Sequence, residues 1–211
     1  MILLVSGATV SGRKYLEHPR FGWLKTPANG NSVATITASG VRWACDNDCY
    51  KALKRDKYVR MLRAVAGQPG LLWVTAPDVV ADADATLARF RIWHPTLDYL
   101  KLPIAFVAQD GQEHRPVPWD AIRCLFIGGS TAWKEGAAAA ALIREAHHRG
   151  KWVHVGRVNT LRRYWWLSSL PIDSIDGTCF SKWPDKFIPW MLRRMDATQH
   201  RMEDLLCEPT P

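Results

Sequence analysis

The chain has 211 residues, of which 47% are hydrophobic, and it carries a formal net charge of +8 at pH 7. This composition excludes an intrinsically disordered chain, and the length suffices for one well-buried domain. No apolar run approaches the roughly 18 residues that span a bilayer, so we expect no membrane partner. The positive charge indicates a polyanionic partner such as nucleic acid, although a solvated basic surface has the same composition.

Cysteine usage and the first residues indicate the compartment. Five cysteines, an odd number, are scattered along the chain, which argues against a disulfide framework and predicts a reducing cytoplasm. Cys45 and Cys49 lie four positions apart, with no second Cys/His pair at a zinc-site spacing nearby, so no metal site is expected. Residues 1–7 lack the basic region of a signal sequence and are interpreted as the first strand.

Short apolar runs recur along the chain without the alternation of a half-exposed strand, as in strands buried on both faces. The expected strands are Ile2–Val5, a weakly marked Val33–Ala38, Val41–Cys45, Leu71–Thr75, Ile104–Val107, Cys124–Ile127, Trp152–Val155 and Asp173–Ile175. The region 15–40 otherwise has the prolines and glycines of a loop.

Segments with helical character lie between most of these runs. They cover residues 51–65, 82–93, 133–148, 158–167 and 187–206, and the last precedes a tail containing Pro209 and Pro211. Strands alternating with helices predict an α/β fold with a parallel sheet. Eight strands close a (β/α)8 barrel of the TIM type, and fewer leave it irregular or incomplete. We favour a compact barrel, as a single domain over residues 1–211, because no glycine-rich nucleotide-binding fingerprint follows the first strand.

Polar residues follow several of the expected strands. Asp46, Asp78 and Asp176 come directly after an apolar run or within three residues of one, and Gln109 follows another. The carboxyl ends of parallel strands meet at one end of the sheet, so we expect one shared pocket. One such Asp is more often a helix cap, whereas three with an amide favour a site. Paired carboxylates suit glycosyl transfer, and they equally suit a divalent metal.

Three further features bear on this pocket. The Gly128–Gly129 pair ends a strand, where its N–H groups can approach a ligand closely. His154, inside an apolar run, is predicted to be a satisfied core histidine. Asp173 and Asp176 stand three residues apart on one strand, so only one faces the pocket. Asp176 is our choice because Gly177 follows it and leaves room for a sugar.

Five motifs in order resemble the tRNA-guanine transglycosylase superfamily, over residues 41–181. They are Ala44-Cys45-Asp46-Asn47, Asp78, Phe106-Val107-Ala108-Gln109-Asp110-Gly111, Phe126-Ile127-Gly128-Gly129-Ser130, and His154-Val155-Gly156-Arg157-Val158 followed by Ile172-Asp173-Ser174-Ile175-Asp176-Gly177-Thr178. The chain departs from members that act on tRNA: it is shorter, and it lacks both their Cys-x-Cys-x-x-Cys…His zinc site and the Ser-Gly-Gly-Phe-Gln after the first Asp. It looks more like the compact branch of bacteriophages and bacterial gene clusters that inserts 7-deazaguanines into DNA.

The resemblance implies a role for each motif. Asp176 is the nucleophile that forms a covalent glycosyl-enzyme, and Asp46 handles the proton. Asp78 binds the guanine N1–H and 2-amino group, and Gln109 with the Gly128–Gly129 segment, through the Gly129 N–H, holds O6. The residues expected to contact phosphates are Arg157, Arg162, Arg163 and Lys182. The implied substrates are DNA, or alternatively tRNA, and a free 7-deazaguanine such as preQ0. No metal or redox cofactor is implied, and the location is the cytoplasm, the host's if the protein is phage-encoded.

Two other functions remain open from the residues alone. A metal-dependent phosphoesterase or nuclease would use Asp46, Asp78 and Asp176 as oxygen ligands. A non-catalytic nucleic-acid-binding barrel would not need the Asp176 carboxylate at all.

Overall fold

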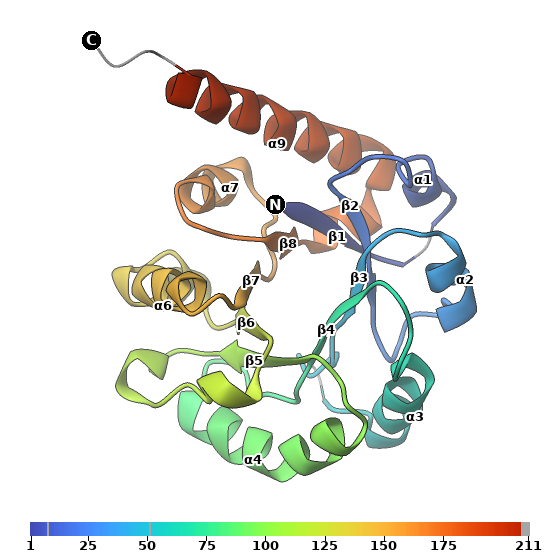
Figure 1. The fold of residues 1–211 in the computed structure, drawn as a ribbon, viewed down its shortest axis with the longest axis vertical. Coiled ribbons are helices and arrows are strands. Elements are labelled where there is room, and N and C mark those ends of the chain that lie inside the picture. Colours follow the sequence, from blue (N-terminus) through green and yellow to red (C-terminus); the bar gives the residue numbers. More distant parts are fainter. Residues whose placement is uncertain (8, 51, 208–211) are drawn as a thin grey trace.

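The computed structural model describes residues 1–7, 9–50 and 52–207. Within them, eight parallel strands in chain order close into a barrel surrounded by helices (Figure 1). The strands are β1 Ile2–Ser6, β2 Phe21–Lys25, β3 Trp43–Cys45, β4 Leu71–Thr75, β5 Ile104–Ala108, β6 Cys124–Ile127, β7 Trp152–Val155 and β8 Ser174–Asp176. The ring closes where β8 pairs with β1, with Ile175 opposite Leu3. The prediction of a TIM-type barrel is therefore confirmed.

The helices lie outside the barrel (Figure 1). They are α1 Val10–Arg13, α2 Val33–Ala38, α3 Arg55–Val65, α4 Ala83–Tyr99, α5 Thr131–Lys134, α6 Ala137–His148, α7 Leu161–Ser168, α8 Thr178–Lys182 and α9 Pro184–Cys207, with 3-10 turns η1 Gln112–His114 and η2 Trp119–Ala121. Helix α9 packs against α1 and α8. The predicted proline tail lies outside the described residues. No helix in the described part of the chain is long and apolar enough to cross a membrane.

Alternating side chains of each strand fill two separate cores. Ile2, Leu4, Leu24, Trp73 and Phe126 belong to the cluster inside the barrel. The intervening positions of the strands pack outward against the helices in a second, larger cluster. Because both faces of every strand are buried, the strands have the continuous apolar pattern seen in the sequence.

The second strand was wrongly predicted. Residues Val33–Ala38, expected as a strand, form helix α2, and β2 is Phe21–Lys25. Two parallel neighbours need a crossover between them, and α2 supplies the crossover from β2 to β3. The Ser32 hydroxyl starts this helix by accepting a hydrogen bond from the Thr35 N–H at 3.0 Å. The sequence of β2 does not predict a strand because Gly22 and the terminal Lys25 interrupt its apolar pattern.

Several helix bounds also differ from those expected. Helix α4 continues through Pro95 to Tyr99, six residues beyond the expected end. The expected helix 133–148 is two helices, α5 and α6, separated at Gly136. Local sequence sets these ends weakly, since packing against the barrel adds to helix propensity.

Gly22 is the position in β2 where a side chain is excluded. A Cβ there would lie 2.6 Å from the Arg42 carbonyl oxygen and 2.9 Å from Leu4 Cδ2, whereas a Cβ at Gly30 would meet nothing within 4 Å. We expect Gly22→Ala to lower the free energy of unfolding by about 1–3 kcal/mol, because backbone must shift to admit the methyl group. Gly30→Ala, the control, should change it by less than about 0.5 kcal/mol. Urea unfolding curves measure both, and equal effects would contradict this account of β2.

Candidate functional site

A cavity of about 670 Å³ opens at the carboxyl-terminal ends of the strands. Residues at or after the end of each of the eight strands line it. The lining includes these residues predicted from the sequence: Asp46, Asp78, Gln109, Gly128, Arg157, Asp176 and Lys182. Among the described residues, the cavity lining does not include Gly129, Arg162 or Arg163. The strand ends thus bring most of the expected side chains to one place.

Asp78 is held at the cavity wall by two amide side chains. Asn47 Nδ2 donates to its Oδ1 and Gln109 Nε2 donates to its Oδ2, both at 2.7 Å. The Asp78 side chain is almost fully buried, and burial raises its pKa despite these hydrogen bonds. Each carboxylate oxygen retains a second lone pair, so the group can still accept hydrogen bonds from a ligand.

The Gly128–Gly129 pair supports Gln109 rather than facing the cavity as a pair. The Gly129 N–H, expected to bind a ligand oxygen, donates to Gln109 Oε1 at 2.7 Å, and the Ala81 N–H donates to the same oxygen at 2.9 Å. A Cβ on Gly128 would lie 2.8 Å from Gln109 Nε2, so glycine is required for this close approach. The pair therefore fixes the orientation of the Gln109 amide.

Asp176 lies at the tip of β8 with both oxygens engaged. The Arg157 N–H donates to Oδ1 at 2.8 Å, and His154 Nε2 lies 3.2 Å from Oδ2. Burial raises the pKa of Asp176, but the neighbouring His154, the Arg157 N–H and the charge of Lys134 together outweigh it, so the pKa lies below its ordinary value. Asp176 is thus an ionised carboxylate at neutral pH.

Asp46, just after β3, has the opposite character. Its Oδ1 accepts a hydrogen bond from the Asn47 N–H at 2.8 Å. Burial and the negative charges of Asp176 and Asp78 raise its pKa to about 7. One cavity therefore holds an ionised carboxylate and a carboxyl group that exchanges its proton near neutral pH.

Asp173 does not reach the cavity. Its Oδ2 accepts a hydrogen bond from the Val153 N–H at 2.8 Å, and its own N–H donates to the Val153 carbonyl at 2.9 Å. It thus tethers the start of β8 to β7, in agreement with its interpretation as a strand-start residue.

Lys134 and Tyr50 also line the cavity, although neither was predicted from the sequence. Lys134 is 4% exposed and donates from Nζ to the Gly156 carbonyl at 3.0 Å. Burial and the neighbouring Arg157 charge lower its pKa to about 8. Tyr50 presents an exposed ring with the Arg157 guanidinium 4.3 Å from the ring centroid. A lysine in the last turn of a short capped helix has the pattern of a surface residue, so only the fold reveals its burial.

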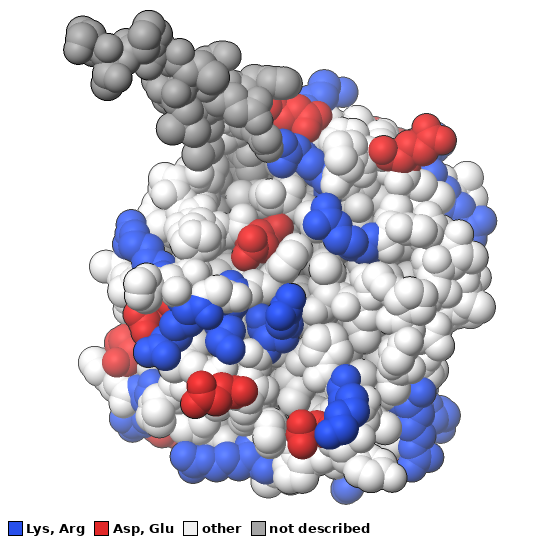
Figure 2. All heavy atoms as spheres, in the orientation of Figure 1, with Lys and Arg blue, Asp and Glu red and all other residues white. Residues whose placement is uncertain are grey.

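The four predicted phosphate contacts divide into two pairs. Arg157 and Lys182 line the cavity. Arg162 and Arg163 both bind Glu135, at 2.6 and 2.9 Å, and Arg163 also donates to the Arg157 carbonyl at 2.9 Å. On the face drawn in Figure 2, basic side chains have acidic ones among them instead of forming one continuous patch.

The described cysteines and the possible metal ligands bear on whether the protein has a disulfide or a metal site. Cys45, Cys49, Cys124 and Cys179 are free thiols. Among the residues that the structure describes, no three His, Cys, Asp or Glu side chains form a group able to hold a metal ion.

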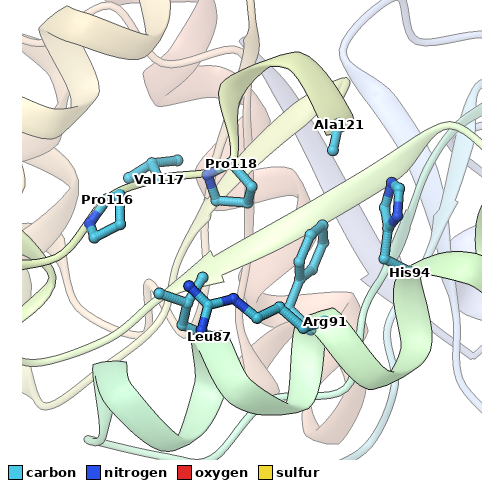
Figure 3. A pocket seen from close by; sticks show the side chains of 8 residues that line it. Leu87, Arg91, His94, Pro116, Val117, Pro118 and Ala121 are labelled. Atoms are coloured by element: carbon cyan, nitrogen blue, oxygen red, sulfur yellow. The ribbon is translucent and has the colours of Figure 1, made fainter.

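A second hollow, of about 340 Å³, lies between α4 and the segment that joins β5 to β6 (Figure 3). Its lining is mostly apolar, with Arg91 and His94 at its edge, and it contains none of the residues predicted to form the site.

No family model and no curated protein sequence matches the chain. Among solved structures, a citrate lyase from Burkholderia xenovorans LB400 is similar with a TM-score of 0.46 and 12% identity, over 83% of this chain and 72% of the lyase. A protein assigned as an isomerase from Sinorhizobium meliloti is similar with a TM-score of 0.48 and 17% identity, over 88% of this chain and 52% of the isomerase chain. BlrP1 of Klebsiella pneumoniae, in a manganese and cyclic di-GMP complex, is similar with a TM-score of 0.36 and 14% identity, over 80% of this chain and 40% of the BlrP1 chain. The chain thus spans about half or less of the last two proteins. Similarity at this level supports no statement about function.

The raised pKa of Asp46 predicts how stability depends on pH. The carboxyl group titrates near 3.8 in the unfolded chain and near 7 in the folded protein. The folded state binds the proton more tightly, so this contribution to stability is complete below the unfolded value and is lost as the pH rises through 7. Asp46→Asn cannot ionise and should therefore gain about 4 kcal/mol over the wild type between pH 4 and pH 8.

Urea unfolding at the two pH values measures this difference. The exposed Asp98 of α4 provides a control, since Asp98→Asn should show the same pH dependence as the wild type. A parallel course for Asp46→Asn and the wild type would show that Asp46 does not retain its proton in the folded state.

Proposed function

We propose that the protein is a guanine transglycosylase that replaces guanine in DNA with a 7-deazaguanine through a covalent Asp176 intermediate. The observation that carries the proposal is the pair of carboxyl groups in one cavity, with the pKa of Asp176 lowered and that of Asp46 raised to about 7. Surroundings that separate two carboxyl groups in this way assign one as nucleophile and the other as acid and base.

The two half-reactions use the same residues. Asp176 attacks C1′ of the nucleotide, the bond from C1′ to the base breaks, and its electron pair leaves with guanine, which takes the proton of Asp46. The incoming base then gives its proton to the Asp46 carboxylate and attacks C1′. Asp176 departs as a carboxylate, and the configuration at C1′ is retained.

Base recognition would use Asp78 and Tyr50, which also line the cavity. Asp78 offers carboxylate lone pairs to the donors on the guanine edge, and the exposed Tyr50 ring offers a surface on which a base can stack. The Gly129 N–H is engaged with Gln109, so O6 would be bound there only if Gln109 turns away. The cavity volume suits one small ligand, and a base from a duplex must flip out to enter it.

DNA is preferred over tRNA because of the departures in sequence described above, and both polymers belong in the test. We expect labelled guanine to enter DNA in the presence of the protein, since the reaction is reversible. Incorporation should survive EDTA, whereas a phosphoesterase that uses Asp46, Asp78 and Asp176 as metal ligands would lose activity. Label in tRNA alone would assign the other polymer, and label in neither would overturn the proposal.

The assignment of the nucleophile can be tested by trapping the covalent complex with DNA on denaturing gels. Asp176→Asn should abolish the complex, because an amide does not form the glycosyl ester. Asp173→Asn is the matched control on the same strand: its carbonyl oxygen can still accept the Val153 N–H, and trapping should persist. Trapping that survives Asp176→Asn but not Asp173→Asn would show that the nucleophile is misassigned.

The cationic lining predicts how DNA binding depends on salt. Lys182 lines the cavity, so Lys182→Ala should weaken binding to all sequences and reduce the slope of log K against log salt by about 1. Arg149, which follows α6 and pairs with Glu145, lies before β7 at the opposite end of the barrel and serves as the control. Equal slopes for the wild type and Lys182→Ala would place the phosphates elsewhere.

A further inference from the structure

Four polar side chains form a hydrogen-bonded row that ends at Asp176. Trp152 and His154 belong to β7, Ser174 and Asp176 belong to β8, and His154 pairs with Ser174 in the strand register. Trp152 Nε1 donates to Ser174 Oγ at 2.8 Å, Ser174 Oγ lies 2.8 Å from His154 Nδ1, and His154 Nε2 lies 3.2 Å from Asp176 Oδ2. Because residues two apart on a strand share a face, both strands direct these side chains into the barrel.

The donors and acceptors of this row define the protonation of His154. An indole N–H only donates, so the Ser174 oxygen accepts from Trp152 and keeps one proton to donate. Ser174 and His154 are both fully buried, and the acceptor in reach is His154 Nδ1. The imidazole then carries its proton on Nε2, where it faces Asp176. An imidazolium would point a second proton at Ser174 and leave the hydroxyl proton without a partner, which is costly in a buried site.

We propose that His154 is a positioning residue, fixed by Ser174 and Trp152 as a neutral Nε2–H donor that orients the Asp176 carboxylate. The carboxylate is then held at one oxygen by His154 and at the other by the Arg157 N–H. Two neutral donors fix its direction without neutralising its charge. The hydrogen-bonded row does not depend on the proposed function. The inference rests on that function only where it says that the oriented carboxylate attacks C1′.

Other charged groups also surround the carboxylate. Lys134 from α5 and the Arg157 side chain after β7 are cationic, and Asp46 after β3 is anionic when deprotonated. Around the imidazole, the Trp73 and Phe126 rings lie with centroids 4.7 and 4.5 Å away. They pack against the ring, whose Nδ1 lies beside Ser174 and whose Nε2 lies beside Asp176.

Nuclear magnetic resonance can test the row without any activity. In protein labelled with 15N-histidine and with 13C at the aspartate carboxyl carbons, the wild type should show His154 as the Nε2–H tautomer at pH 7. His154→Gln keeps an N–H donor near the same place, and Asp176 should titrate close to its wild-type pH. His154→Met keeps the bulk but removes the donor, and Asp176 should titrate at higher pH. An Nδ1–H tautomer or an imidazolium at pH 7 in the wild type would overturn the inference, even if the variants fail to fold.

The exchange assay then separates this inference from the proposed function. His154→Met should lower kcat by about 10- to 100-fold, with KM for DNA within about twofold of the wild type, and it should move the acid limb of the pH profile upward, while His154→Gln restores that limb. An active wild type whose pH profile is unchanged in His154→Met would overturn the positioning role. The expected tautomer and titrations in a wild type that exchanges no base would uphold the row and overturn the transglycosylase proposal.

Discussion

A strand that is buried on both faces has room for polar side chains only at its ends, and this constraint organises the whole structure. The barrel closes through β8 and β1, so no strand has an edge or a face in water. Polar groups at strand level therefore gather at the rims, and Asp46, Asp78, Gln109 and Asp176 lie at or after the ends of four different strands, around one cavity. The α/β pattern of burial thus creates the site before any specific contact is considered.

The exceptions to this constraint are informative, because a buried polar group must find a partner. The Thr75 hydroxyl donates to the Cys45 carbonyl at 3.0 Å, and this hydrogen bond links β4 to β3. Ser174 and His154 differ, because their contacts continue along the barrel interior to a carboxylate in the cavity. The need of buried polar groups for hydrogen-bond partners therefore links two strands at Thr75, whereas at Ser174 and His154 it holds the Asp176 carboxylate in place.

Much of this could be predicted from the sequence, for identifiable reasons. Continuous apolar runs located seven strands, and the polar residue after each one located most of the cavity. The prediction failed at β2, where Gly22 and Lys25 break the apolar pattern, and Lys25 is accommodated by a contact of its Nζ with Asn29 Oδ1 at 3.2 Å. Such a contact depends on the loop after the strand. Sequence likewise could not show that Arg163 would bind Glu135 or that Lys134 would be buried against the Gly156 carbonyl, since both contacts join segments that are far apart in the chain.

The pKa values of Asp46 and Asp176 are shifted in opposite directions because the two carboxyl groups have different partners. Asp176 receives the His154 and Arg157 hydrogen bonds and has Lys134 nearby, all of which favour its ionised form. Asp46 receives a single backbone hydrogen bond and faces two other carboxyl groups, which disfavour ionisation in a partly desolvated cavity. Because Asp176 is already charged, its charge helps to keep the proton on Asp46. In the reaction that we propose, the charge of Asp176 therefore favours the protonated form of Asp46 before the attack. Formation of the ester would remove that charge, and Asp46 would then serve better as a carboxylate base.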